Sequence, residues 1–106
     1  MGRYAQASRR GRPSRIGPAP VSGLTLQVGD FFVVTFNAVA GTWTLEWELE
    51  WGVGGYQFSE TGTFPLASGG GETSVEPGAM DTAHVRARVI VAGAPHDWSA
   101  WVNYIT

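Results

Sequence analysis

The residues with the clearest capacity for chemistry are three glutamates in the stretch 42–52 (TWTLEWELEWG): Glu46, Glu48 and Glu50. Because side chains alternate between the two faces of a β-strand, these carboxylates would share one face, with neighbours roughly 7 Å apart. That spacing falls within the separation of the two catalytic carboxyl groups in inverting glycosidases. The stretch therefore admits a hydrolytic site, and it also raises the question of a cation site.

Neither kind of site fits the pattern well. A glycosidase needs one carboxyl group with a raised pKa in a cleft, and an open sheet face gives little desolvation. A calcium site needs more oxygen ligands gathered around one point, usually from a loop. The alternating pattern favours a strand with a solvated acidic face and a buried apolar face, the latter formed by Trp43, Leu45, Trp47, Leu49 and Trp51.

A second stretch offers partners for the acids. In residues 84–91 (HVRARVIV), Arg86 and Arg88 alternate with small and β-branched apolar residues, so both arginines would face the same side of a strand. We predict that these arginines lie across from two of the three glutamates on a neighbouring strand. Cross-strand pairs of opposite charge contribute roughly 0.2–1 kcal/mol each.

Aromatic residues near the C-terminus extend this picture. Trp98 and Trp101, in WSAWV, are three residues apart, which places them on opposite faces of a regular strand. One indole would enter the core, and the other would lie outside on the arginine stems as a cation–π contact. We expect a stiffening surface ladder formed by Glu46, Glu48, Glu50, Arg86, Arg88 and Trp101. The alternative is a platform for sugars or partners that uses Trp98 or Trp101, together with Tyr56.

No other motif predicts catalysis or a cofactor. His84 and His96 lie near Asp81 and Asp97 in the sequence, but no zinc-binding spacing such as HExxH is present, and the chain has no cysteine. There is no G-x-S-x-G elbow. The glycines of 52–55 lack the third glycine and the helix of a dinucleotide site, so they indicate a hairpin turn. We expect no catalytic residues, no metal and no cofactor, and hence no enzyme.

Charge is distributed very unevenly along the chain. Residues 1–20 contain five arginines and no acid, whereas residues 21–106 contain two arginines and nine acids. Pro13, Pro18 and Pro20 disfavour a helix in the first segment and favour extended backbone. We expect residues 1–20 to be a basic arm that docks on an acidic protein surface rather than on nucleic acid, which the acidic body would repel. Its predicted contact residues are Arg3, Tyr4, Arg9, Arg10, Arg12, Arg15 and Ile16.

Residues 21–106 read as a single all-β domain. Short apolar and alternating runs are separated by clusters of Gly, Pro, Asn and Asp, and no window has helical spacing. This pattern predicts an antiparallel sandwich of seven or eight strands. The expected strands are 22–28, 31–40, 42–51, 56–64 (interrupted at Gly62), 73–75, 84–91 and 98–105, with a flexible loop at 67–71 and a turn at 92–97.

Three segments resemble a known family. FFVVTFNAVAG and TWTLEWELEW are similar to the second and third strands of fibronectin type III domains, which are immunoglobulin-like sandwiches. The segment VEPGAMDTAHVRARVIVAGAPHDWSAWVNYI resembles their C-terminal part, with a Pro-Gly turn, an Arg-bearing sixth strand and a WSxWS-like last strand. The resemblance covers residues 21–106 and implies a seven-stranded sandwich whose third and sixth strands are neighbours. The tyrosine expected after the Pro-Gly turn is missing, and His84 comes closest to its place.

These features together suggest a function class. A single sandwich with an arginine arm, an initial methionine and no apolar run for a signal peptide or membrane helix is similar to virion structural proteins of tailed bacteriophages. We expect a capsid or tail decoration protein, made in the host cytoplasm, whose partners are capsid or tail subunits. Association between copies is left open. The alternative is a module that binds carbohydrate or a host cell surface.

Overall fold

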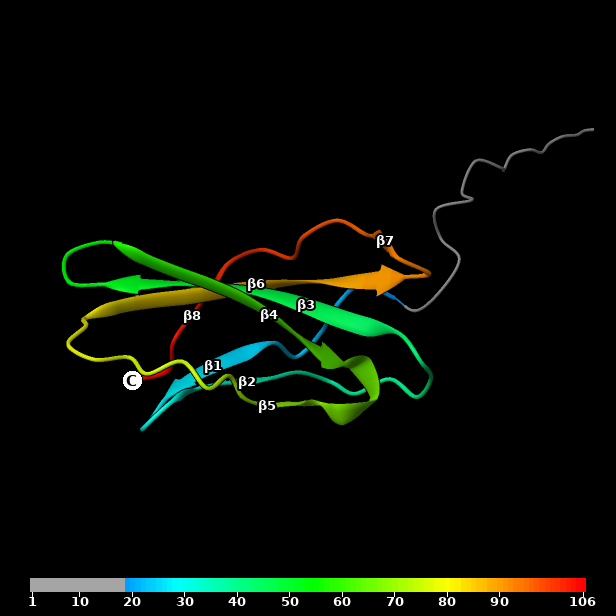
Figure 1. Ribbon diagram of the computed structural model, residues 1–106, viewed down its shortest axis with the longest axis horizontal. Helices are drawn as coiled ribbons and strands as arrows, with labels where there is room; N and C mark the ends of the chain where they lie inside the picture. Colours follow the sequence, from blue (N-terminus) through cyan, green and yellow to red (C-terminus); the bar gives the residue numbers. More distant parts are fainter. Residues whose placement is uncertain (1–18) are drawn as a thin grey trace, which may run out of the picture.

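The computed structural model describes residues 19–106, and the predicted contact residues of the arm, Arg3, Tyr4, Arg9, Arg10, Arg12, Arg15 and Ile16, lie outside the described residues. The described part is an all-β sandwich of two antiparallel sheets, as the sequence predicts (Figure 1). One sheet has the order β1 (Thr25–Val28), β2 (Phe32–Thr35), β5 (Gly70–Glu72). The other has the order β4 (Phe58–Pro65), β3 (Thr44–Gly52), β6 (Thr82–Val91), β7 (Ala94–Pro95), and β8 (Val102–Asn103) also pairs with β6.

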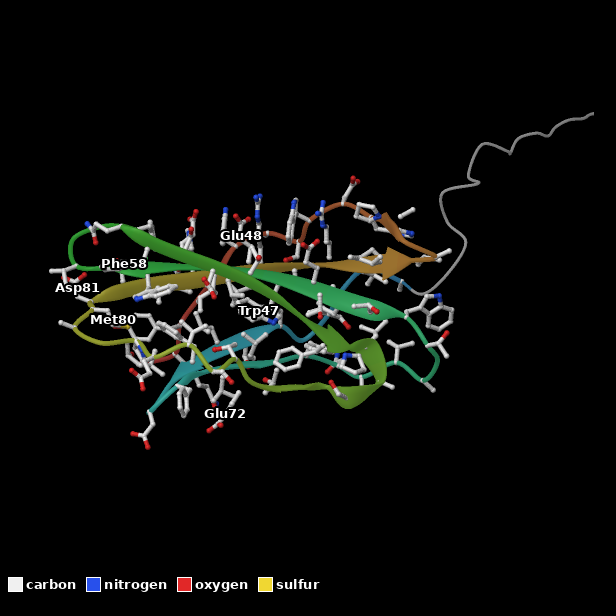
Figure 2. The ribbon with its side chains drawn as sticks, viewed as in Figure 1. Trp47, Glu48, Phe58, Glu72, Met80 and Asp81 are labelled. Carbon is white, nitrogen blue, oxygen red and sulfur yellow. The ribbon has the colours of Figure 1, made fainter. Side chains whose placement is uncertain are left out.

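The apolar row of β3 faces the second sheet, which confirms the central prediction from the sequence. Leu45 and Leu49 are fully buried and Trp47 is 4% exposed, whereas Trp43 and Trp51 at the ends of the row are partly buried. Figure 2 shows Trp47 between the two layers and Glu48 on the outside of the five-stranded sheet. The rest of the core is apolar too, and its members are Leu26, Phe32, Val34, Phe36, Leu66, Ala83, Val85, Ala87 and Val89.

The last residues of the chain join the two sheets. β8 pairs with β6, and the Tyr104 N–H donates to the Ala83 carbonyl 3.1 Å away in the five-stranded sheet. The Ile105 N–H then donates to the Leu26 carbonyl in β1, at 2.9 Å. In Figure 1 this segment descends from one layer to the other at the side of the sandwich. The C-terminal strand therefore ties the layers together with backbone hydrogen bonds.

Several strands differ from their expected bounds. β1 and β2 are shorter than the predicted 22–28 and 31–40, and β4 runs unbroken through Gly62, where an interruption was expected. Gly62 does not interrupt the strand. It lies directly against the flat ring of Trp47, where there is no room for a side chain, so glycine is needed for β4 to continue at this point. Only Val102–Asn103 of the predicted strand 98–105 is paired as a strand, and β7 lies inside the predicted turn 92–97.

The segment 67–75 differs from the expected structure. The predicted loop at 67–71 overlaps the one-turn 3₁₀ helix η3 (Leu66–Ser68) and includes the start of β5, while the predicted strand 73–75 is not paired as a strand. Gly70 has a φ of +101°, and a Cβ there would lie 2.0 Å from the Val34 carbonyl oxygen. Glycine is thus required for close backbone pairing with β2, and a run that looks like a flexible loop is a strand.

Candidate functional site: the charged face of the five-stranded sheet

The outer face of the five-stranded sheet carries three cross-strand rungs. β3 and β6 pair so that Glu46 lies opposite Arg88, Glu48 opposite Arg86 and Glu50 opposite His84. The Arg88 Nε donates to Glu46 Oε1 at 2.7 Å, and the Arg86 Nε and Nη2 both donate to Glu48 Oε1, each at 2.7 Å. The predicted pairing of both arginines with two of the glutamates is therefore confirmed.

The third rung was not predicted. His84 Nε2 lies 2.8 Å from Glu50 Oε1, and the histidine side chain is only 12% exposed. The sequence pattern placed His84 at the start of the strand 84–91 and indicated no partner for it. The signal that could have found it is spacing, because His84 is two residues before Arg86 and so shares its face.

Aromatic rings fill the spaces between these rungs. Tyr56 stacks on His84 with ring centroids 3.9 Å apart, and His84 stacks on Trp101 at 3.8 Å. The Arg86 guanidinium carbon lies 4.7 Å from the Trp101 ring centroid and 4.6 Å from that of Trp98. The Arg88 carbon lies 4.2 Å from the Trp98 centroid. The stacked side chains of the surface ladder follow the order Tyr56, His84, Trp101, Arg86, Trp98, Arg88. Tyr56, His84 and Trp98 thus belong to the ladder in addition to the residues expected from the sequence.

The two tryptophans do not lie on opposite faces, so this prediction was wrong. They would alternate only in a regular strand, and residues 96–101 are not paired as one. Instead the Ser99 N–H donates to the Ala87 carbonyl at 2.8 Å, and the Ser99 hydroxyl accepts from the Ala87 N–H at 3.0 Å. This anchors the loop over β6, where Trp98 and Trp101 both contact Arg86.

The ladder leaves little for the acids to do chemically. Each of the three carboxylates already accepts from a partner on β6 and lies on a sheet face rather than in a cleft. Within residues 19–106, no group of three acidic or histidine side chains is close enough to hold a metal ion. The arrangement is suited to stiffening the sheet and holding the loop 96–101.

Arg86 should be the most important member of the ladder for stability. It contacts two indole rings and one carboxylate, so Arg86→Ala should lower the free energy of unfolding by about 2 kcal/mol, whereas Arg88→Ala should cost about 1 kcal/mol. Arg86→Lys keeps the charge but loses the planar stacking surface, and it should fall between wild type and Arg86→Ala. Urea denaturation measures all three, and equal losses for the two alanine variants would contradict the ladder geometry.

A cavity of about 620 Å³ lies at the end of the ladder, where the described chain begins. Pro20, Val21, Pro95, His96 and Trp98 are among the residues that line it. The chain therefore enters the sandwich beside β7. His96 and Asp97 line this cavity, whereas Asp81 and His84 do not. The two histidines and the two aspartates therefore do not form one cluster.

Comparisons with known proteins add no family to this description. No protein-family model, curated protein or solved structure matches the chain. Within residues 19–106, no helix has the length and apolar character needed to cross a membrane.

Proposed function

We propose that this chain is a non-enzymatic structural protein that docks on other proteins through its arginine arm, while the sandwich is a rigid body. The observation that carries the proposal is that both arginines of residues 21–106 are already engaged in contacts within the sandwich. Arg86 and Arg88 are each bound by a glutamate and packed on tryptophan in the ladder. A partner that requires cations must therefore find them among the five arginines of the arm, residues 1–20.

The partner we propose is an acidic protein surface on a virus particle. An arginine can bind a carboxylate through two parallel hydrogen bonds, so five of them spread along an extended segment supply both affinity and orientation. The body carries nine acids, which disfavours a nucleic-acid backbone as partner. We propose a decoration or accessory protein on the capsid or tail of a tailed bacteriophage, with a fibronectin type III-like body. The pairing of β3 with β6 supports that resemblance.

The alternative, a carbohydrate-binding module, has weaker support. An aromatic platform for sugars needs an uncovered ring face, but Trp101 contacts both His84 and Arg86, and Trp98 contacts both arginines. His84, Arg86 and Arg88 are spaced along one strand face, so each indole inserts between two of them. Tyr56, at 45% exposure, is the ladder ring that remains most accessible. This geometry favours a structural role for both indoles.

The arm should determine binding to particles. A variant lacking residues 1–20 keeps every core residue, because the core cluster begins at Leu26. We expect its occupancy on particles stripped of the native protein to fall by at least about tenfold, since most of the cations that contact the partner are lost. Co-sedimentation of particles with intact and shortened chains measures this. Undiminished occupancy of the shortened chain would rule out the docking role.

A further inference from the structure

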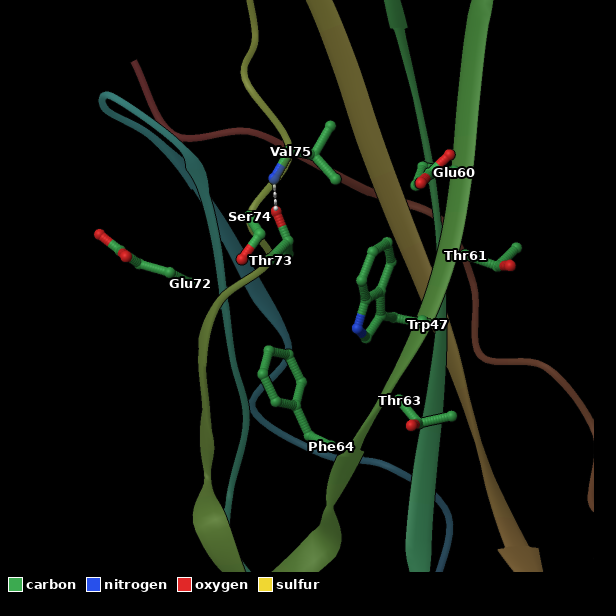
Figure 3. A pocket seen from close by; sticks show the side chains of 10 residues that line it. Trp47, Glu60, Thr61, Thr63, Phe64, Glu72, Thr73, Ser74 and Val75 are labelled. Atoms are coloured by element: carbon green, nitrogen blue, oxygen red, sulfur yellow. Dashed lines mark hydrogen bonds between the residues drawn. The ribbon is translucent and has the colours of Figure 1, made fainter.

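An open groove of about 310 Å³ lies between the two sheets on the side away from β7. One wall is the edge strand β4 and the other is the segment from Glu72 to Val75, and Trp47 and Phe64 form part of its inner surface. Figure 3 shows these walls converging where β4 joins β5 through η3. The groove is therefore closed at one end and elongated along β4.

The backbone of β4 is available along this groove. β4 is the last strand of its sheet and pairs only with β3 within the described residues. The Leu66 N–H donates to the Trp43 carbonyl, and with the observed register this makes Gly62 and Trp47 a hydrogen-bonded pair. The N–H and C=O groups of Thr61 and Thr63 consequently point away from β3. They offer the pattern that an added strand requires.

A buried polar atom also faces this groove. The Trp47 Nε1 is buried without a hydrogen-bond partner, the only such side-chain atom among the described residues. A donor without an acceptor costs about 1–3 kcal/mol, so most buried donors are paired. In Figure 3 the indole nitrogen points between the two walls, toward the gap that separates Phe64 from Thr73. An acceptor from a bound segment would remove this penalty.

The β4 wall of the groove carries the carboxylate of Glu60, and none of the lining residues is basic. Glu72 belongs to the other wall, but its carboxylate points away from the groove in Figure 3. The arm carries five arginines, no acid and prolines that favour extended backbone, and it includes Gln6, Ser8 and Ser14 as side chains with acceptor oxygens. Eighteen residues are ample for pairing with the eight residues of β4. Charge, length and hydrogen-bonding capacity of the arm all complement the groove.

We propose that the groove binds residues of the arm from a second copy of this chain, as a strand added to the free edge of β4. Pro20 and Val21 lie beside Pro95 of β7, at the opposite edge of the five-stranded sheet from β4. The arm is therefore joined to the described body at one edge of the sheet and the groove lies at the other, so binding between copies is head-to-tail. This inference rests on the docking role of the arm given above, and it adds a second copy of this chain as an acceptor beside the particle surface.

Two full-length variants test the arrangement by complementation. The arm variant carries Arg9→Glu, Arg10→Glu and Arg12→Glu, and the groove variant carries Thr61→Pro. Proline at 61 removes an N–H that does not bond to β3, and proline is tolerated on edge strands. Sedimentation velocity should show concentration-dependent association of the intact chain, monomers of each variant alone, and a one-to-one complex when the variants are mixed. Thermal unfolding checks that both variants are folded.

The contrary outcomes are equally defined. The proposal would be overturned if the mixture formed no complex. It would also be overturned if the intact chain stayed monomeric across the micromolar range, which is the result expected of an arm that folds back on its own groove. Glu60→Lys should weaken association by about tenfold, whereas Asp30→Lys, an equal charge change in the exposed β1–β2 turn, should not. Equal weakening by both would show nonspecific charge attraction and would also overturn it.

A spectroscopic measurement reports on the groove directly. A peptide of residues 1–18 is titrated into the full-length arm variant while the indole N–H signals of the five tryptophans are followed by NMR. The Trp47 signal should shift because its N–H gains an acceptor, and the Trp98 signal should not. If the peptide leaves Trp47 unchanged while the arm is still needed on particles, this inference fails and the proposed function stands. If copies associate through the groove but shortened chains still occupy particles, the proposed function fails instead.

Discussion

Replacing Trp47 with alanine is expected to lower the free energy of unfolding by about 3–5 kcal/mol, the usual cost of removing a large aromatic side chain from a core. Trp47 is 4% exposed, lies beneath Gly62 and has its ring 6.4 Å from that of Phe64. It fills the space between the sheets near the free edge of β4, where few other side chains can move in to close a cavity. Urea denaturation followed by circular dichroism measures the loss.

Trp47→Phe is the matched control, because it keeps an aromatic ring and removes the unpaired N–H. Loss of an unsatisfied buried donor is favourable, so this variant should be clearly more stable than Trp47→Ala despite its smaller ring. A loss below about 1 kcal/mol for Trp47→Ala would mean that the indole is not a core side chain. That result would overturn the orientation of β3, and with it the assignment of the glutamates to the outer face.

Gly70→Ala should destabilise the sandwich by about 3 kcal/mol or more. The residue has a φ of +101°, which strains any side chain, and the new Cβ would lie 2.0 Å from the Val34 carbonyl oxygen and 2.9 Å from the Thr35 Cα. Both contacts are with the backbone of β2, which cannot move without disturbing the pairing of β2 with β5. The same denaturation measurement applies.

Gly78→Ala separates the two contributions. Gly78 also has a positive φ, of +61°, but a Cβ there meets nothing within 4 Å. Its alanine variant should therefore lose only the conformational part, about 1 kcal/mol. If Gly70→Ala and Gly78→Ala lost equal stability, the close approach of β5 to β2 would be refuted.

Alternation in the sequence was sufficient to predict the parts of the fold that depend on burial. The row from Trp43 to Trp51 can bury its large side chains on only one face, so the opposite face had to hold the glutamates. Since Arg86 and Arg88 alternate in the same way, their pairing with two of the three glutamates followed once the two strands were taken as neighbours. The observed register of β3 and β6 then gives Glu48 and Glu46 as the partners. Both predictions depend on the period of a strand and little else.

The strand β5, the loop 96–101 and the groove beside β4 depend on contacts between distant residues, which the hydrophobic pattern of the sequence does not show. β5 is rich in glycine, and its strand character comes from the close approach of β2 rather than from its own propensity. The loop 96–101 puts both indoles on one face because Ser99 bonds to Ala87, which is distant in sequence. The groove beside β4 arises from two edges of different sheets, so nothing local in the sequence indicates it.

We propose that this protein binds through its arm while the ladder supports the sandwich. The most direct measurement compares particle occupancy of three full-length chains: wild type, a variant with Arg9, Arg10 and Arg12 changed to Glu, and Trp101→Ala, which interrupts the ladder between His84 and Arg86. Below the unfolding temperature of each chain, the arm variant should lose at least about tenfold in occupancy and Trp101→Ala should retain it. Full occupancy of the arm variant would contradict this proposal, and so would an equal loss of occupancy with folded Trp101→Ala.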